Sequence, residues 1–359
     1  MSGIWGDNIK LSIFGESHGA AIGISINGLE PGVELDLNLI DIEMARRAPG
    51  NSELSTPRKE SDQIQILSGF FHGKTTGTPL CVMIQNSNTQ SADYERASKL
   101  LRPSHADFTG AIKYNGFHDY RGGGHFSGRL TAPIIFAGAV CRQILEKKGI
   151  TIGALIKSIG RVEGKGLDLL KVSASELNQL HNSEFPVLDL EAGSRMKETI
   201  MKAKETKDSV GGVIECAVVN LPAGVGDPFF DSLESRLSQL LFSIPGVKGV
   251  EFGDGFQISS MTGTEANDCY YMDGENIKIS SNHNGGILGG ISNGMPIVFR
   301  VAIKPTPSIG RMQKTVNIEE MKDAELKIIG RHDPCIVPRA IPVVEAVAAI
   351  AILDLMGRR

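Results

Sequence analysis

The chain has 359 residues, of which 41% are apolar and 22% charged, the composition of an ordinary globular protein with ample material for a core. Its formal net charge of −4 argues against a general nucleic-acid binder, which would present a broad basic surface. The five cysteines are odd in number and share no CxxC spacing, so neither a disulfide framework nor a metal site is predicted.

The longest apolar run covers residues 341–356 and contains Glu345 and Asp354. Two charges within the run predict a packed helix rather than a membrane span. The N-terminus lacks a basic region followed by an apolar stretch, so no secretory leader is expected. We therefore expect a cytoplasmic protein that needs neither a membrane nor a nucleic acid as partner.

Short strands are predicted at residues 11–14 and 21–26, and the turn between them holds Ser17 and His18 between two glycines. Such a turn exposes both side chains at a strand end. Taken alone, such a turn is more often a polar hairpin tip with a solvated histidine.

Asp36 is expected to open a helix that stops near Pro49, with Arg46 and Arg47 in its last turn. Cations in a last helical turn interact favourably with the helix dipole, so these two arginines have a structural interpretation as well as a ligand-binding one.

The chain contains an internal duplication. The pattern GxxxGxxxGxP occurs at residues 69–79 and 286–296, each time before an apolar strand and after another strand, a Gly/Pro turn and an amphipathic helix. This predicts an α+β fold with duplicated strand-turn-helix units in one domain over residues 1–359. The expected intertwined repeats cover about 10–150 and 211–356, and the polar segment 161–186 is expected at the periphery.

Three consecutive glycines, residues 122–124, lie between Arg121 and Arg129 and lead into a helix for which Thr131 is the expected N-cap. Glycine allows positive φ and close approach of the backbone to a ligand. A helix N-terminus and two guanidinium groups favour a phosphate or carboxylate. We therefore predict an anion site rather than a plain surface hairpin, although the spacing is neither a Walker A nor a dinucleotide motif.

Three further loops bring together groups suited to a charged ligand. Residues 102–108 place His105 two positions before Asp107, which can orient the imidazole. Residues 304–308 are stiffened by prolines and offer an ammonium and hydroxyl groups. Residues 330–339 concentrate two arginines, a histidine and an aspartate ahead of the last helix.

Together these motifs resemble the chorismate synthase family. The resemblance extends from residue 10 to about 355 and rests on seven pieces: residues 15–19, 46–50, 102–107, 120–124, 281–290, 304–306 and 330–335. It implies a layered β-α-β sandwich assembled as a homotetramer. It also implies a lyase of aromatic amino acid biosynthesis that eliminates phosphate from 5-enolpyruvylshikimate 3-phosphate to give chorismate, with reduced FMN and no net redox change.

The resemblance also implies the site residues. A substrate with two carboxylates and a phosphate needs several guanidinium groups in one cleft. The implied substrate residues are Arg46, Arg47, Arg129, Arg331 and Arg339, with Arg121 as a further candidate. His18 is implied to protonate the leaving phosphate, His105 to stabilise the reduced flavin, and Asp333 to lie beside flavin N5, with Ser17 and Ser127 as proton relays. The implied FMN contacts are His125, Phe126, Ser127, Gly289, Lys304, Pro305, Thr306, Pro307, Ser308 and Arg331.

The sequence departs from the family pattern at three places. Ser104 stands where many members have glycine, and His125-Phe126 replaces a more polar pair. Glu53 stands where some members place an arginine assigned to NADP, so we expect an external flavin reductase, or another source of reduced FMN, rather than intrinsic NADPH-dependent reduction. The remaining histidines, among them His181 and His332, are given structural roles first.

Two alternatives stay open at this point. One is a flavin-independent sugar-phosphate enzyme in which His18 and His105 perform acid–base chemistry. The other is an anion-binding regulatory module without turnover.

Overall fold

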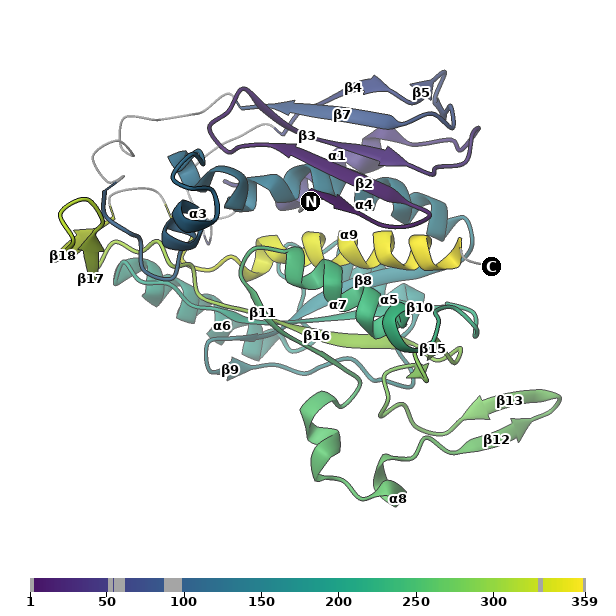
Figure 1. Cartoon of the computed structure of the whole chain (residues 1–359). Helices are drawn as coiled ribbons and strands as arrows, with labels where there is room; N and C mark the ends of the chain where they lie inside the picture. The colour runs from purple at the N-terminus through teal and green to yellow at the C-terminus, as the bar shows by residue number, and fades with distance from the viewer. Residues whose placement is uncertain (1–2, 51–53, 55–61, 87–98, 329–331, 358–359) are drawn as a thin grey trace.

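The computed structural model describes residues 3–50, 54, 62–86, 99–328 and 332–357. Two five-stranded antiparallel sheets enclose a layer of helices, as Figure 1 shows. The first sheet has the order β1-β2-β3-β7-β4, and the second has the order β11-β16-β10-β8-β9. The strands of the first sheet are β1 (Ile4–Trp5), β2 (Lys10–Gly15), β3 (Ala21–Asn27), β4 (Ile64–Ser68) and β7 (Leu80–Gln85). Those of the second are β8 (Thr151–Ile159), β9 (Val162–Glu163), β10 (Gly212–Val219), β11 (Val247–Phe252) and β16 (Ile297–Ile303).

The helical layer holds the main core. It consists of α1 (Leu37–Arg47), α4 (Thr131–Glu146), α7 (Leu233–Ser243) and α9 (Val337–Met356). Nearly every residue of α9 is buried, and α9 crosses α4 so closely that a Cβ added to Gly138 would lie 2.2 Å from the Cβ of Ala346. Asp354, fully buried near the end of α9, accepts backbone N–H bonds from Asp7, Asn8 and Ile9. Within the described part of the chain, no helix has the length and apolar character needed to cross a membrane.

The two halves share one topology, which confirms the predicted duplication. In the first half the order along the chain is β3, α1, β4 and β7, and β7 pairs with β3 and with β4. In the second half the order is β10, α7, β11 and β16, and β16 pairs with β10 and with β11. A small hairpin precedes β7 (β5, Phe70–Phe71; β6, Lys74–Thr75) and another precedes β16 (β14, Ile287–Leu288; β15, Ile291–Ser292).

The glycines of the repeated motif explain why the pattern was visible in the sequence. Their φ angles are 80°, 79° and 82° at residues 69, 73 and 77, and 82°, 85° and 89° at residues 286, 290 and 294. These values lie in the left-handed region that disfavours a Cβ, so the same turn needs glycine at the same three positions in both copies.

The segment 161–186 is more than a peripheral loop. It contains α5 (Ala174–His181), which packs with Leu177 and Leu180 against Leu155 of β8 and Val219 of β10 on the outer face of the second sheet. The next helix, α6 (Leu190–Glu205), buries Met196 and Ile200 along one face. In the sequences of α5 and α6, polar residues separate the apolar positions, so the buried face of each helix was not recognised.

The remaining elements lie outside these layers. They are α3 (Asp107–Lys113), the 3₁₀ turns η1 (Arg121–Phe126), η2 (Gly128–Leu130), η3 (Phe229–Asp231) and η4 (Gly255–Ser260), α8 (Gly263–Ala266), and the hairpins β12 (Tyr270–Asp273) with β13 (Asn276–Ile279) and β17 (Met312–Asn317) with β18 (Lys322–Lys327).

Candidate active site

A cavity of about 430 Å³ lies where the C-terminal end of α1 meets the N-terminal ends of α4 and α9. Most of the expected site residues line it: Ser17, Arg47, His105, Phe126, Ser127, Arg129, Lys304, Pro305, Thr306, Pro307, Ser308, Asp333 and Arg339. They come from six separate segments of the chain, which only the fold brings together.

Five expected residues do not line this cavity. His18 lies just behind its wall, against Gly122. His125 donates from Nδ1 to the carbonyl of Gly15, and Gly289 belongs to the turn between β14 and β15. Arg46 and Arg121 are held by carboxylates elsewhere. Arg331 and Glu53 lie outside the described residues.

The glycine triplet packs against the two expected catalytic histidines. Gly122, Gly123 and Gly124 have φ angles of 57°, 87° and 52°. A Cβ on Gly122 would lie 2.1 Å from Nδ1 and Cε1 of His18, and one on Gly123 would lie 3.2 Å from Nε2 and Cε1 of His105. The close approach that we expected between glycine and ligand is therefore made, within the protein, to the two imidazole rings.

We expect Gly122→Ala to displace His18 and to lower the turnover number by at least about tenfold. A heavy atom at 2.1 Å cannot be accommodated, and alanine is also strained at φ 57°. Steady-state kinetics, with circular dichroism to verify folding, would measure the effect. Gly73→Ala provides the control, because it has a similar φ strain at 79° but no heavy atom within 4 Å of the added Cβ. Equal activity of both variants would contradict the assigned packing.

Three arginines form one wall of the cavity. Arg47 is buried and donates to Asp62 (2.7 Å), the carbonyl of Gly128 (3.0 Å) and the hydroxyl of Thr131 (3.0 Å). Arg129 also pairs with Asp62, and Arg339 donates to the carbonyl of Arg47 (3.1 Å). Burial, together with the charges of Arg339 and Arg129, lowers the pKa of Arg47 to about 10 despite Asp62, so it stays charged at neutral pH.

Two details of this wall differ from the sequence analysis. Thr131 is the first residue of α4 rather than its N-cap, which is Leu130, and the Thr131 hydroxyl instead donates to the carbonyl of Gly128 (2.6 Å). Asp62 was missed altogether. It sits in a polar stretch without a motif, and nothing in the sequence shows that the fold will bury it between Arg47 and Arg129.

The loop before α3 also lines the cavity. Asp107 accepts hydrogen bonds from Arg102 Nη2 (2.6 Å) and Nε (2.8 Å), and one of its oxygens lies 2.8 Å from Nδ1 of His105. Although burial acts to raise the pKa of Asp107, bonds from His105 and Arg102 hold it well below its usual range. Lys304 donates to the carbonyl of Ser104 (2.7 Å) and so joins the 304–308 segment to this loop.

Comparison with known proteins matches the whole of this arrangement to one family. A family described as "Chorismate synthase" matches residues 9–356. Two curated relatives carry that name: one from Pyrococcus abyssi is 48% identical, covering 98% of this chain and 97% of the relative, and one from Dehalococcoides mccartyi is 46% identical, covering 100% and 97%. This chain belongs to the chorismate synthase family. A solved structure titled "Crystal Structure of Chorismate Synthase" superposes with a TM-score of 0.74 at 30% identity, covering 98% of this chain and 92% of that one.

One departure from the chorismate synthase pattern now has a structural explanation. Ser104 adopts φ 58°, in the left-handed region that glycine favours. Ser104 thus takes a backbone conformation that glycine adopts with less strain, and His105 still lines the cavity.

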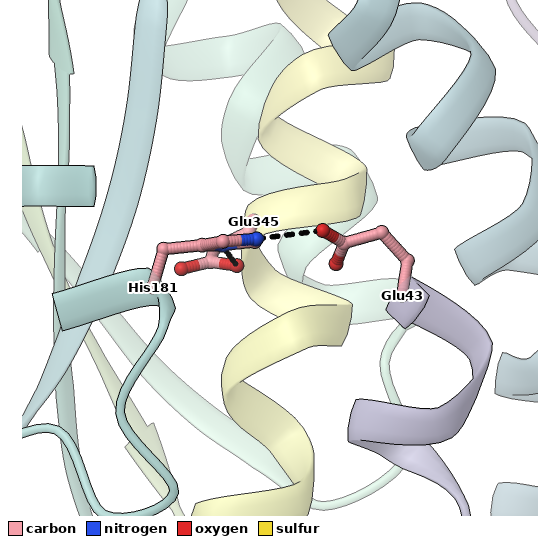
Figure 2. Close-up of side chains that lie close together, drawn as sticks. All are labelled: Glu43, His181 and Glu345. Carbon is pink, nitrogen blue, oxygen red and sulfur yellow. Dashed lines mark hydrogen bonds and ion pairs between the residues drawn. The ribbon is translucent and has the colours of Figure 1, made fainter. Parts of the chain in front are cut away.

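Arg46, which the resemblance implies to be a substrate residue, belongs to a buried ion-pair cluster. Its Nη1 lies 2.6 Å from Glu345 and 2.8 Å from Glu43. Figure 2 shows His181 of α5 reaching between these two carboxylates, with Nε2 2.8 Å from Glu43 and Nδ1 3.2 Å from Glu345. Arg142 lies 3.5 Å from Glu345. Two guanidinium groups therefore offset two carboxylates, and α1, α4, α5 and α9 are tied together at one point.

This cluster predicts a pH dependence of stability. Burial acts to lower the pKa of His181, but bonds to Glu345 and Glu43 raise it above its usual 6.5. A raised pKa in the folded state contributes stability that is fully present below pH 6.5 and is lost as the pH rises through the folded value. We expect the difference in unfolding free energy between the native protein and His181→Gln to be larger at about pH 6 than at about pH 9, as urea unfolding would measure. A difference that grows with pH would contradict the assignment.

Proposed function

We propose that this protein converts 5-enolpyruvylshikimate 3-phosphate into chorismate and phosphate. The observation that carries the proposal is that one cavity is lined by three arginines, His105 and Asp333 together with the hydroxyls of Ser17 and Ser127. The reaction is a 1,4-elimination. The C6 proton and the C3 phosphate leave opposite faces of the ring, so the site needs anion binding together with groups that move protons.

Arg47, Arg129 and Arg339 are the proposed substrate-binding residues. The substrate carries two carboxylates and a phosphate, and guanidinium groups pair with such anions in a two-pronged geometry. Because Asp62 orients two of the three before the ligand arrives, little rearrangement is needed on binding. Arg46 and Arg121 are not part of this proposal, since neither of them lines the cavity.

His18 and Ser17 are the proposed acid for the departing phosphate. Ser17 lines the cavity, and a Cβ on Gly122 would touch both the His18 ring and the Ser17 hydroxyl, so the two side chains adjoin one glycine. A proton delivered to the phosphate oxygen neutralises the charge that develops there. Asp333, held by Arg339, is the proposed carboxylate near the C6 proton.

The same cavity also fits FMN. The segment 304–308, Phe126 and Ser127 line it, and the buried hydroxyl of Thr306 has no hydrogen-bond partner among the described residues. Reduced FMN, when bound, would supply an electron transiently and recover it after phosphate has left. The protein's own part is to place the groups and to hold His105 as a donor, oriented by Asp107.

The proposal includes a homotetramer in the cytoplasm and an external source of reduced FMN. The expectation that NADPH cannot serve directly rests on Glu53, which lies outside the described residues. It predicts that the purified protein with NADPH and FMN alone yields no reduced flavin.

The test is an anaerobic assay with 5-enolpyruvylshikimate 3-phosphate and chemically reduced FMN, in which chorismate and phosphate are followed together. We expect equal release of both, and none with oxidised FMN. Phosphate release without flavin would favour the flavin-independent enzyme. Binding without any product would favour an anion-binding module.

We expect His105→Ala to bind substrate and FMN within a fewfold of the native affinity but to lose about a hundredfold or more in turnover, the usual contribution of a positioned proton donor. Single-turnover kinetics would separate the two effects. His72→Ala is the matched control, because His72 is exposed in the β5–β6 turn. A His105→Ala variant with native turnover would remove this residue from the mechanism.

A further inference from the structure

His332 faces the cavity but has no role so far. It lies directly before Asp333 and lines the cavity together with Arg102, His105 and Thr306. Its Nε2 is buried and has no hydrogen-bond partner among the described residues. A buried polar atom without a partner is costly, and native structures leave few of them. The unpaired Nε2 therefore points to a partner that comes with a ligand.

Thr306, which lines the same cavity, has a second buried atom of this kind. Its Oγ1 is also buried and unpaired among the residues described. Two unpaired hydrogen-bonding atoms, on two segments that line one cavity, match a ligand with several polar atoms along one edge. The isoalloxazine ring of a flavin has such an edge of alternating donors and acceptors.

The charged groups around His332 give it a different chemical character from the three arginines of the cavity. Burial, and then the positive charge of Arg102, lower its pKa, with Asp333 acting in the opposite direction. The imidazole is therefore neutral at physiological pH and offers a hydrogen bond without a charge. A neutral ring is poorly suited to a phosphate or carboxylate, which the arginines already serve, and well suited to an uncharged heterocycle.

We propose that His332 is a further ligand of the cofactor, binding the polar edge of the flavin ring through Nε2. This inference rests on the proposed function. It assigns to His332 a contact beyond the roles proposed above for His105, Asp333 and the 304–308 segment.

The test is the dissociation constant of oxidised FMN, measured by quenching of flavin fluorescence, for the native protein and His332→Phe. Phenylalanine keeps the ring and removes both nitrogens. We expect FMN to bind about tenfold more weakly or worse, because the flavin then buries a group without a partner. The affinity for 5-enolpyruvylshikimate 3-phosphate in the absence of flavin should stay within about twofold. His72→Phe, at an exposed histidine, should leave both affinities unchanged.

His332→Gln provides a second measurement in case the phenylalanine variant does not fold. Its amide sets the hydrogen bond at a different distance, so the visible absorption spectrum of bound FMN should shift. Three outcomes would each overturn the inference. They are a native FMN affinity in His332→Phe, an unchanged flavin spectrum in His332→Gln, and a weaker affinity of His332→Phe for the substrate in the absence of flavin. If the native protein itself bound no FMN, the proposed function would fail as well as the inference about His332. If the native protein bound FMN and His332→Phe bound it equally well, only the inference about His332 would fail.

Discussion

Replacing Arg129 by alanine should weaken binding of 5-enolpyruvylshikimate 3-phosphate by about 2–5 kcal/mol, which corresponds to roughly thirtyfold to a few thousandfold in the dissociation constant. Arg129 is buried and shares Asp62 with Arg47. Its loss removes one of the charges proposed to bind the substrate. It also leaves Asp62 to Arg47 alone, which should draw this second guanidinium away from the ligand. Both effects act in the same direction. Isothermal titration calorimetry with the substrate, under conditions in which no turnover occurs, would measure the change in the dissociation constant.

Two variants sharpen this experiment. Arg129→Lys keeps the charge but loses the forked geometry, so its affinity should fall between those of the native protein and Arg129→Ala. Arg311→Ala is the matched control. Arg311 is an exposed arginine paired with Asp208 at 2.7 Å and does not line the cavity. Native affinity in Arg129→Ala would show that the substrate binds elsewhere.

Replacing Glu345 by alanine should lower the free energy of unfolding by about 3–5 kcal/mol, the cost typical of breaking a buried ion pair. The Glu345 side chain is 3% exposed and meets Arg46 at 2.6 Å, His181 at 3.2 Å and the backbone N–H of Ala154 at 3.0 Å. Burial acts to raise its pKa, but Arg46 and its other partners hold it well below the usual range, so the lost group is a carboxylate. Urea unfolding followed by circular dichroism would measure the loss.

The control for Glu345 is an exposed carboxylate. Glu163 pairs with Lys157 at 3.0 Å while 71% of its side chain is exposed, so Glu163→Ala should cost no more than about 1 kcal/mol. Glu345→Gln keeps an oxygen that can accept from Ala154 and should fall between the two. Comparable stability of Glu345→Ala and Glu163→Ala would mean that the cluster contributes little.

Local rules made part of the site predictable from the sequence. Asp36 caps α1 as expected, with its side chain accepting from Asn38, because an N-cap depends on neighbouring residues only. The Ser17-His18 turn and the three-glycine loop were found because glycine marks positions where the backbone takes positive φ. Most of the loops that line the cavity could thus be predicted from the sequence.

The different directions of two neighbouring arginines could not be predicted from the sequence. Arg46 and Arg47 are adjacent and chemically alike, yet successive helical residues point about 100° apart, so one joins Glu345 and the other Asp62. Their direction depends on how α1 packs against α4 and α9.

The sequence by itself determined the duplicated topology, the turns that need glycine, and the set of loops rich in arginine and histidine. These features follow from backbone sterics and short-range spacing. The tertiary structure alone decided that Gly122 packs on His18, that Asp62 joins Arg47 to Arg129, and that His181 reaches Glu43 and Glu345. These contacts link residues far apart in the chain, and burial changes what a charge or a glycine does there.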